Sequence, residues 1–306
     1  TEQSTDTPTG TGFSLKAQVT TADTSIAAAQ FAYIHQNIEA QNLQTLQYGT
    51  SDAKNITLSF QVKSNKTGTY TIVVRKLDTT AYHFVIEYTI NSANTWEKKE
   101  ITISPTAGST SLITASGGAI ANDNGTGFQI GWNLAFGSNG ATNNTWSSNT
   151  SHYATSNQVN WMDSTSNNFY LTQVQLEIGD VATPFEHEDI GTTLRKCQRY
   201  YNMMGADAAY SFYGACFCSS PTVGKVQIMF PVEMRTAPTL GSSTVSKLGI
   251  FTAAGNPVLT SININNPSTW GTAVDPNVSS GLTAGQSSQL IAVNDASAYL
   301  EFIAEL

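Results

Sequence analysis

The feature that most constrains this chain is a succession of short segments in which apolar and polar side chains alternate. A period of two places every second side chain on the same face of a β-strand. Residues 57–63, which read Thr-Leu-Ser-Phe-Gln-Val-Lys, show this alternation clearly, and residues 70–75 repeat it. Only the turn-forming stretch 64–68 separates the two segments, so we predict that they form a β-hairpin.

Further segments with strand character follow at 83–90, 96–103, 128–134 and 169–177. Turns separate these segments and no long helical pattern intervenes, which is typical of an antiparallel β-sandwich. We expect one long loop, at 137–160, which is rich in Asn, Ser and Thr.

The pattern changes near residue 184. We expect Asp189 to cap a short helix that runs from Ile190 to about Tyr201, and strand patterns resume after it. The later strands are predicted at 209–218, 224–232, 248–252, 257–263, 289–293 and 298–304. The sequence therefore predicts an all-β chain with a polar leader over 1–11, a sandwich over 12–188, a helical connector over 189–202 and a second β-sandwich domain over 203–306.

The charge and the lengths of the apolar runs argue against two classes of partner. Only 12% of the residues are charged, against about 25% in an average soluble protein, and the net charge is −8 with 14 Lys and Arg. Because no basic stripe can follow a phosphate backbone, we expect no nucleic-acid partner. No apolar run approaches the roughly 18 residues of a membrane span, so we expect no membrane insertion. The chain starts at Thr1 rather than Met, so export signals cannot be judged from it.

The three cysteines, Cys197, Cys216 and Cys218, do not form a disulfide framework. Their odd number and their spacing favour free thiols in a protein assembled in a reducing cytoplasm. Cys216 and Cys218 lie two residues apart in an apolar strand, which places both on one face, where we expect them to pack. A strained pair or a metal site is the alternative for these two residues.

The sequence predicts neither a catalytic site nor a cofactor. It contains no GxSxG, HExxH, paired CxxC or Walker motif. His187 stands among Glu186, Glu188 and Asp189, a set of ligands that suits zinc or manganese. Consecutive residues cannot all point at one ion without a special loop, so we favour helix capping over a metal site.

Aromatic residues among small polar ones are the positive signal. Sugars stack their apolar faces on aromatic rings while amides and hydroxyls bind the ring hydroxyl groups. Trp146, His152, Tyr153 and Trp161 lie in or beside the long loop and are our candidate carbohydrate-binding residues, with Asn144 and Asn157 as polar neighbours. Core packing of the tryptophans, Trp161 above all, is the alternative.

Residues 169–201 read FYLTQVQLEIGDVATPFEHEDIGTTLRKCQRYY. Leu176-Glu177, Gly179, ATPFE at 182–186 and CQRYY at 197–201 together resemble a phrase of many bacteriophage virion proteins, described as tail fibre or appendage proteins and found especially in marine phages. Glu188 stands where that phrase commonly has Arg. The resemblance extends over about 11–202, and FPVEMRTAPT at 230–239 resembles a step common downstream.

This resemblance implies a jelly-roll β-sandwich like that of carbohydrate-binding modules. The aromatic-rich opening strands usual in that module are absent, so we expect either a truncated chain or a first strand from elsewhere, such as a neighbouring subunit. The implied function is that of a non-enzymatic structural protein of the virion: a tail fibre, spike or head appendage. It would be assembled in the host cytoplasm, contact other virion proteins and bind a host surface glycan during adsorption.

Large apolar residues in the C-terminal domain independently favour a homo-oligomer. Trimeric fibres bury such strands between subunits, and the residues that suggest it here are Phe217, Ile228, Phe230, Phe251 and Ile262. We expect a homotrimer in which this domain is the oligomerising part or the distal tip. The alternative is that these residues fill one monomeric sandwich.

Three other functions stay open at this point. In the first, the jelly roll is a purely architectural spacer or a capsid decoration. In the second, the chain is a bacterial surface or filament protein. A polysaccharide-degrading enzyme is the third, and its paired carboxylates would have to come from Glu87, Glu97, Asp123, Asp163 or Glu177.

Overall fold

A computed structural model describes residues 1–138 and 144–306 of the protein, so part of the loop expected over 137–160 lies outside the described residues. The fold is almost entirely β, and its strands pair antiparallel. The chain divides into two compact units, Thr1–Glu186 together with Leu306, and His187–Glu305. This division falls at the N-terminal side of the region 188–202 where the sequence places the boundary.

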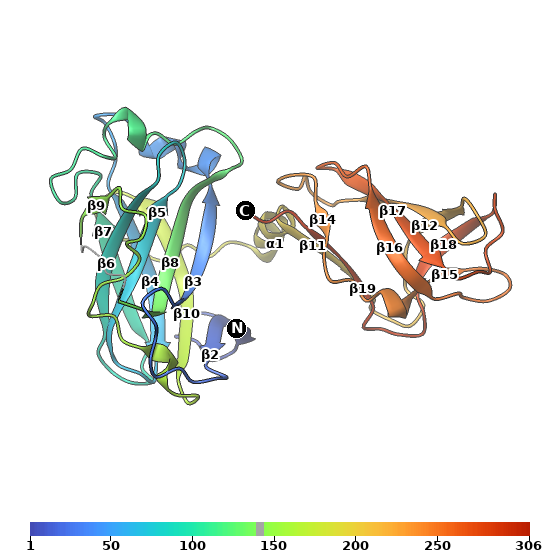
Figure 1. The fold of residues 1–306 in the computed structure, drawn as a ribbon, viewed down its shortest axis with the longest axis horizontal. Coiled ribbons are helices and arrows are strands. Elements are labelled where there is room, and N and C mark those ends of the chain that lie inside the picture. Colours follow the sequence, from blue (N-terminus) through green and yellow to red (C-terminus); the bar gives the residue numbers. More distant parts are fainter. Residues whose placement is uncertain (139–143) are drawn as a thin grey trace. The chain divides into compact units, whose positions relative to one another are not determined.

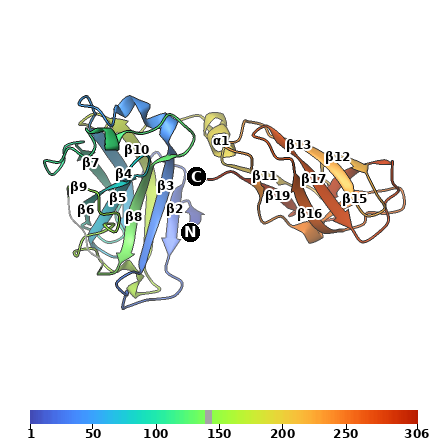
Figure 2. The same ribbon diagram turned by 45° about the horizontal axis from the view of Figure 1, so that its top comes forward.

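The first unit is a jelly-roll β-sandwich of two five-stranded sheets (Figures 1 and 2). One sheet has the order β1 (Glu2–Ser4), β2 (Ser14–Gln18), β10 (Asn168–Ile178), β4 (Ile56–Ser64) and β7 (Glu97–Ile103). The other has the order β3 (Phe31–Glu39), β8 (Thr126–Phe136), β5 (Gly68–Lys76), β6 (Tyr82–Ile90) and β9 (Trp146–Ser147). Three short 3-10 helices lie at Ala40–Leu46, Ser116–Gly118 and Trp161–Asp163.

The core of this unit forms between the two sheets from the alternating residues of their strands. Leu58, Phe60 and Val62 of β4 are at most 1% exposed and face Ile72 of β5 and Trp132 of β8 across the sandwich. The ring of Phe60 meets that of Trp132 edge to face, with 5.8 Å between centroids. Burial of these large side chains is the main source of stability in the sandwich.

The N-terminal residues are more ordered than the expected leader. Residues 2–4 form β1, which pairs with β2 and adds an ion pair between Lys16 and Glu2 at 2.8 Å. Asp6 accepts hydrogen bonds from the Lys63 ammonium and, at 3.3 Å, from the indole N–H of Trp96. The leader is therefore the edge of a sheet, held by charged groups that a search for apolar periodicity overlooks.

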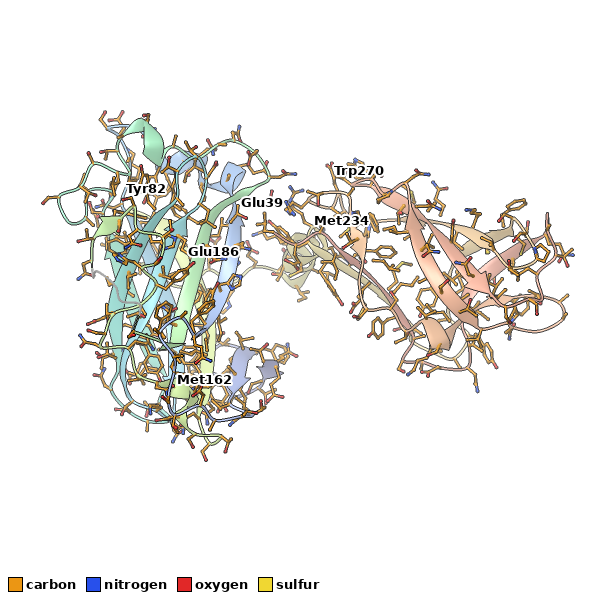
Figure 3. The ribbon with its side chains drawn as sticks, in the orientation of Figure 1. Glu39, Tyr82, Met162, Glu186, Met234 and Trp270 are labelled. Atoms are coloured by element: carbon orange, nitrogen blue, oxygen red, sulfur yellow. The ribbon has the colours of Figure 1, made fainter. Side chains whose placement is uncertain are left out.

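One buried cation fixes the loops at one end of the first unit. The side chain of Lys76, at the end of β5, is fully buried. Its ammonium donates to the backbone carbonyls of Asp78, Thr80 (3.0 Å) and Gly117 (2.8 Å), and lies 5.4 Å from the ring centroid of Tyr82, labelled in Figure 3. Burial lowers the pKa of Lys76 to about 8. Three carbonyl acceptors offset the cost of burying this charge.

The second unit begins with the helix expected from the sequence. Helix α1 spans Ile190–Gln198, and the Asp189 carboxylate caps it by accepting from the backbone N–H of Thr192 at 3.0 Å. The expected end near Tyr201 is too late, because Tyr201 already starts a strand.

Two further sheets form a second sandwich around a core of its own. The smaller has the order β11 (Tyr201–Gly205), β19 (Tyr299–Ile303) and β14 (Thr239–Leu240). The larger has the order β15 (Leu248–Phe251), β18 (Ser287–Ala292), β12 (Phe212–Cys218), β13 (Gly224–Met229), β17 (Gly271–Val278) and β16 (Leu259–Asn265), with a 3-10 helix at Val245–Lys247.

The structure divides the five apolar residues that suggested an oligomer into two groups. Ile228, Phe230 and Ile262 fill the core of their own unit, as the monomeric alternative expects. Phe217 and Phe251 remain 52% and 53% exposed.

Cys216 and Cys218 pack in the core of the second unit, as the sequence predicts. Cys216 and Cys218 are buried side by side on one face of β12, while Cys197 is exposed on α1. All three are free thiols.

Candidate functional site

Two of the four candidate carbohydrate-binding residues are core residues. Trp146 and Trp161 are 1% and 3% exposed and belong to the core of the first unit. Each indole N–H donates to a backbone carbonyl, from Trp146 to Ser104 at 2.9 Å and from Trp161 to Asn168 at 3.1 Å. Neither ring offers a face to a ligand, so the assignment of these two tryptophans to a sugar site is wrong.

His152 is half-buried and holds its own loop together. Its imidazole contacts the Ser147 hydroxyl at 3.3 Å and the Asn149 amide at 2.9 Å. Its backbone carbonyl lies 3.1 Å from Nδ1 of His83 on β6. His152 therefore positions the loop beside the sheet.

Tyr153 lies at the centre of an aromatic cluster on the outer face of the β3–β8–β5–β6 sheet. Its ring stacks on Phe31 with an interplanar angle of 4° and on Phe136 with an angle of 21°, at centroid distances of 6.1 and 5.7 Å. Tyr33 lies 6.4 Å away and in turn contacts His35 at 5.0 Å. We call these five residues, Phe31, Tyr33, His35, Phe136 and Tyr153, the aromatic face.

Strand geometry explains why these rings gather outside the core. Phe31, Tyr33 and His35 alternate along β3 with core-facing residues such as Ile34, so all three point outward. Phe31 is 54% exposed, which leaves ring surface available for stacking.

A β-bulge in β8 adds Phe136 to this face. Ala32 pairs with Ala135 and Tyr33 with Asn133, so Leu134 is the extra residue. Since a bulge re-aims the side chains that follow it, Phe136 opposes Phe31 on the outer face instead of entering the core.

A glycine makes room for the Tyr33 ring. A Cβ at Gly131 would approach the Tyr33 ring to 3.1 Å and Val73 to the same distance. The absence of a side chain at this position of β8 lets the tyrosine ring lie across the sheet.

Polar groups run across the same sheet beside the rings. Arg75 of β5 donates from Nη1 to the Gln129 carbonyl oxygen, and Gln129 donates from its amide to Asn37 of β3 at 2.9 Å. Nε of Arg75 donates to Nε2 of His83 at 3.2 Å. The guanidinium carbon lies 5.0 Å from the centroid of Tyr153. Aromatic surface and hydrogen-bonding groups therefore share one face.

The two histidines beside Arg75 are held neutral. Burial lowers the pKa of His83 to about 4, although the backbone carbonyl of His152 favours the protonated ring, and the nearby Arg75 charge lowers it further. Burial, and then the same arginine, also lower the pKa of His35. Neutral His83 fits the contacts, because Nε2 must carry a lone pair to accept from Arg75.

Hydrogen bonds pin the loop that carries Tyr153. Thr155 donates to the Glu87 carboxylate at 2.5 Å, and Asn157 donates to the same oxygen at 3.1 Å. The Gln158 carbonyl oxygen accepts from the backbone N–H and the hydroxyl of Thr71, both at 2.7 Å. Such anchoring reduces the entropy lost when a ligand binds.

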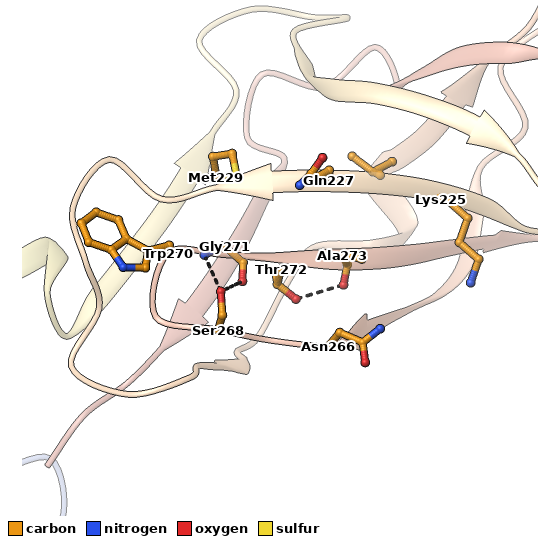
Figure 4. A pocket seen from close by; sticks show the side chains of 10 residues that line it. Lys225, Gln227, Met229, Asn266, Ser268, Trp270, Gly271, Thr272 and Ala273 are labelled. Atoms are coloured by element: carbon orange, nitrogen blue, oxygen red, sulfur yellow. Dashed lines mark hydrogen bonds between the residues drawn. The ribbon is translucent and has the colours of Figure 1, made fainter.

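A hollow lies on the surface of the second unit. It has a volume of about 520 Å³ and is lined by polar residues together with the exposed Trp270 and Met229 (Figure 4). Trp270 is 56% exposed and lies within a turn in which the Ser268 hydroxyl bonds the backbone of Gly271. Lys225, which lines the hollow, pairs with Asp275 at 2.5 Å, so its charge is compensated.

Neither a metal cluster nor a membrane helix is found in the described part of the chain. No group of three or more His, Cys, Asp or Glu in residues 1–138 and 144–306 is arranged to hold a metal ion. No helix in these ranges has the length and apolar character to cross a bilayer.

Tyr153 is expected from the sequence as a candidate residue, but the residues that it contacts are not. The signal was present at residues 31–35, where Phe31, Tyr33 and His35 occupy every second position. Arg75 ends the predicted strand 70–75, and nothing in the sequence alone places it beneath a tyrosine from a distant loop.

Comparison with known proteins adds little to this geometry. No known family matches the sequence, and no curated protein is similar to it. Among solved structures, a crystal structure of Cucumber Necrosis Virus aligns over 96% of this chain and 86% of that chain, at 10% identity and a TM-score of 0.16. Similarity at this level carries no argument about function.

Proposed function

We propose that this protein is a non-enzymatic structural component of a bacteriophage virion, such as a tail fibre, spike or head appendage, which binds host surface glycans during adsorption. The aromatic face is the observation that carries the glycan-binding part. The virion part rests on the resemblance of ATPFE at 182–186 and CQRYY at 197–201 to phage appendage proteins.

The aromatic face suits a saccharide in three respects. The exposed ring of Phe31 and the half-buried rings of Tyr33 and Tyr153 provide apolar platforms for sugar C–H groups. Gln129 and Asn37 supply amides within the same face. The face is shallow, so a single site is expected to bind weakly, and repetition on a virion raises the avidity by about 10²–10⁴.

Glycan-array binding by the whole chain tests the proposal. We expect Phe31→Ala and Tyr33→Ala to abolish the signal, and Tyr210→Ala, which removes an exposed tyrosine from the second unit, to leave it unchanged. The absence of any bound glycan would favour an architectural spacer or decoration protein. Release of reducing ends from a bound polysaccharide would instead reveal an enzyme.

Mass spectrometry of purified virions tests the location. Peptides of this chain in the particle are expected for a phage component that contacts other virion proteins. Peptides on the surface of uninfected cells would indicate a bacterial filament protein.

We further propose that the second unit assembles the chain into a homotrimer. Phe217, Phe251 and Met229 all point to the outer face of the six-stranded sheet and are 52%, 53% and 65% exposed, and Trp270 lies beside Met229. Light scattering is expected to give three times the 32.7 kDa chain mass. The double variant Phe217→Ser/Phe251→Ser is expected to be monomeric, and a monomeric wild-type chain would refute the assembly.

A further inference from the structure

Beside Tyr153 of the aromatic face lies a positive charge, that of Arg75, which makes no ion pair within the described residues. Arg75 is half-buried beneath Tyr153, and the hydrogen bonds of its guanidinium go to His83 and Gln129, both of which are neutral. A guanidinium has five N–H donors, and these two bonds leave three of them, one on Nη1 and both on Nη2, without a partner among the described residues. A partly buried charge in this situation is unusual, since most such charges are paired.

Glu87, an acidic residue on the same sheet, is already bonded to the loop. Glu87 of β6 accepts from Thr155 and Asn157 of the loop, and none of the ion pairs within residues 1–138 and 144–306 includes Arg75. Residues 139–143, outside the described ranges, contain no Asp or Glu. Among the described residues, no carboxylate therefore pairs with this guanidinium.

Two other aromatic sites that contain a cation pair it with an acidic residue. Lys225 in the hollow of the second unit pairs with Asp275. Lys63, which lies against Trp96 and Tyr170 on the opposite sheet, pairs with Asp6. Both of these aromatic and lysine clusters are neutralised from within, so the open charge at Arg75 distinguishes the aromatic face from the other exposed aromatic sites.

We propose that the ligand of the aromatic face is an acidic glycan, whose carboxylate or sulfate group pairs with Nη2 of Arg75 while its sugar rings stack on Phe31, Tyr33 and Tyr153. This inference rests on the proposed glycan-binding function. A planar guanidinium matches both anionic groups in geometry. In a protein of net charge −8, a local cation is also needed to overcome the general repulsion of an acidic polymer.

Affinity electrophoresis of the whole chain with three polymers tests this inference. The polymers are alginate, which carries carboxylates, carrageenan, which carries sulfate esters, and laminarin, which is neutral. We expect the wild type to bind one of the acidic polymers at least about tenfold more tightly than laminarin, with a preference that added salt weakens. The acidic polymer that is preferred identifies which anion the site takes.

Three variants separate the charge from the fold. Arg75→Gln keeps a hydrogen-bonding side chain but removes the charge, and it is expected to lose the preference for the acidic polymer. Arg75→Lys is expected to retain part of it, which guards against misfolding as the cause. Arg195→Gln, at an exposed position on α1, is the matched control and is expected to behave as wild type.

The outcomes distinguish this inference from the function on which it rests. Equal binding of laminarin and the acidic polymers, lost in Phe31→Ala but not in Arg75→Gln, would overturn the acidic preference and keep the glycan site. Binding of no polymer would overturn both. Tight binding of an acidic polymer that Arg75→Gln leaves unchanged would also overturn the role of Arg75.

Discussion

Replacement of Trp146 by alanine separates a core residue from a sugar-binding one. The Trp146 side chain is 1% exposed, packs against Phe84 at a centroid distance of 5.3 Å and against Tyr48 at 6.3 Å, and donates to the Ser104 carbonyl. Loss of a buried indole and the cavity left behind cost about 3–5 kcal/mol. Trp146→Phe keeps most of the ring volume and strands the Ser104 carbonyl, which costs about 1–3 kcal/mol.

Differential scanning calorimetry measures this effect. Each unit has its own core, so we expect two unfolding transitions, of which Trp146→Ala moves only one. For a unit of this size a loss of 1 kcal/mol lowers Tm by about 2–4 °C, so the shift should be about 6–20 °C. The matched control is Tyr210→Ala, whose exposed ring should leave the transitions of both units within about 0.5 kcal/mol.

The reasoning has a clear point of failure. If Trp146→Ala leaves both transitions in place but abolishes glycan binding, the indole faces a ligand and not the core. A shift of both transitions together would show instead that the two units unfold as one.

Three further predictions concern the buried ionisable groups. Lys76→Met should lower the free energy of unfolding of the first unit by roughly 2–4 kcal/mol in urea, because three carbonyls lose their donor, and an unchanged midpoint would contradict the anchoring role. Because burial lowers the pKa of His83 from 6.5 to about 4, the unfolded chain binds a proton first as the pH falls. Stability of the first unit should therefore be full above pH 6.5 and fall by up to about 3 kcal/mol between pH 6.5 and 4, and His83→Gln should flatten that dependence. Burial raises the pKa of Cys216 to about 11, so Ellman's reagent should modify only Cys197 in the native protein, and rapid modification of Cys216 or Cys218 would show that β12 opens readily.

The strands that the sequence predicts well are those with one apolar and one polar face. Residues 57–63 fall within β4 (Ile56–Ser64), and residues 83–90 fall within β6 (Tyr82–Ile90). Strand β3 was not singled out, because Phe31 and Tyr33 on its outer face are as apolar as the core-facing Ala32 and Ile34. An aromatic outer face removes the contrast on which the pattern depends.

The candidate site was harder to predict than the fold. A tryptophan has an apolar body and one polar N–H, so the sequence around Trp146 and Trp161 is compatible with either a core or a ligand site. The carbonyl that accepts from Trp146, at Ser104, is distant in sequence, and the one that accepts from Trp161, at Asn168, comes into reach only because the chain turns back after the 3-10 helix. Tyr153 reaches its partners only through the folded loop, and no local pattern encodes that contact.

The bulge at Leu134 shows that the number of residues in β8, and not only their chemistry, decides which face of the sheet Phe136 occupies. Deletion of this one residue would remove the bulge and leave Phe136 opposite Phe31, whereas insertion of one residue between Ala135 and Phe136 would turn Phe136 toward the interior. The composition of the strand would hardly change, yet one ring of the aromatic face would be lost. A single-residue insertion in such a strand can therefore exchange a surface ring while the opposite sheet keeps its register.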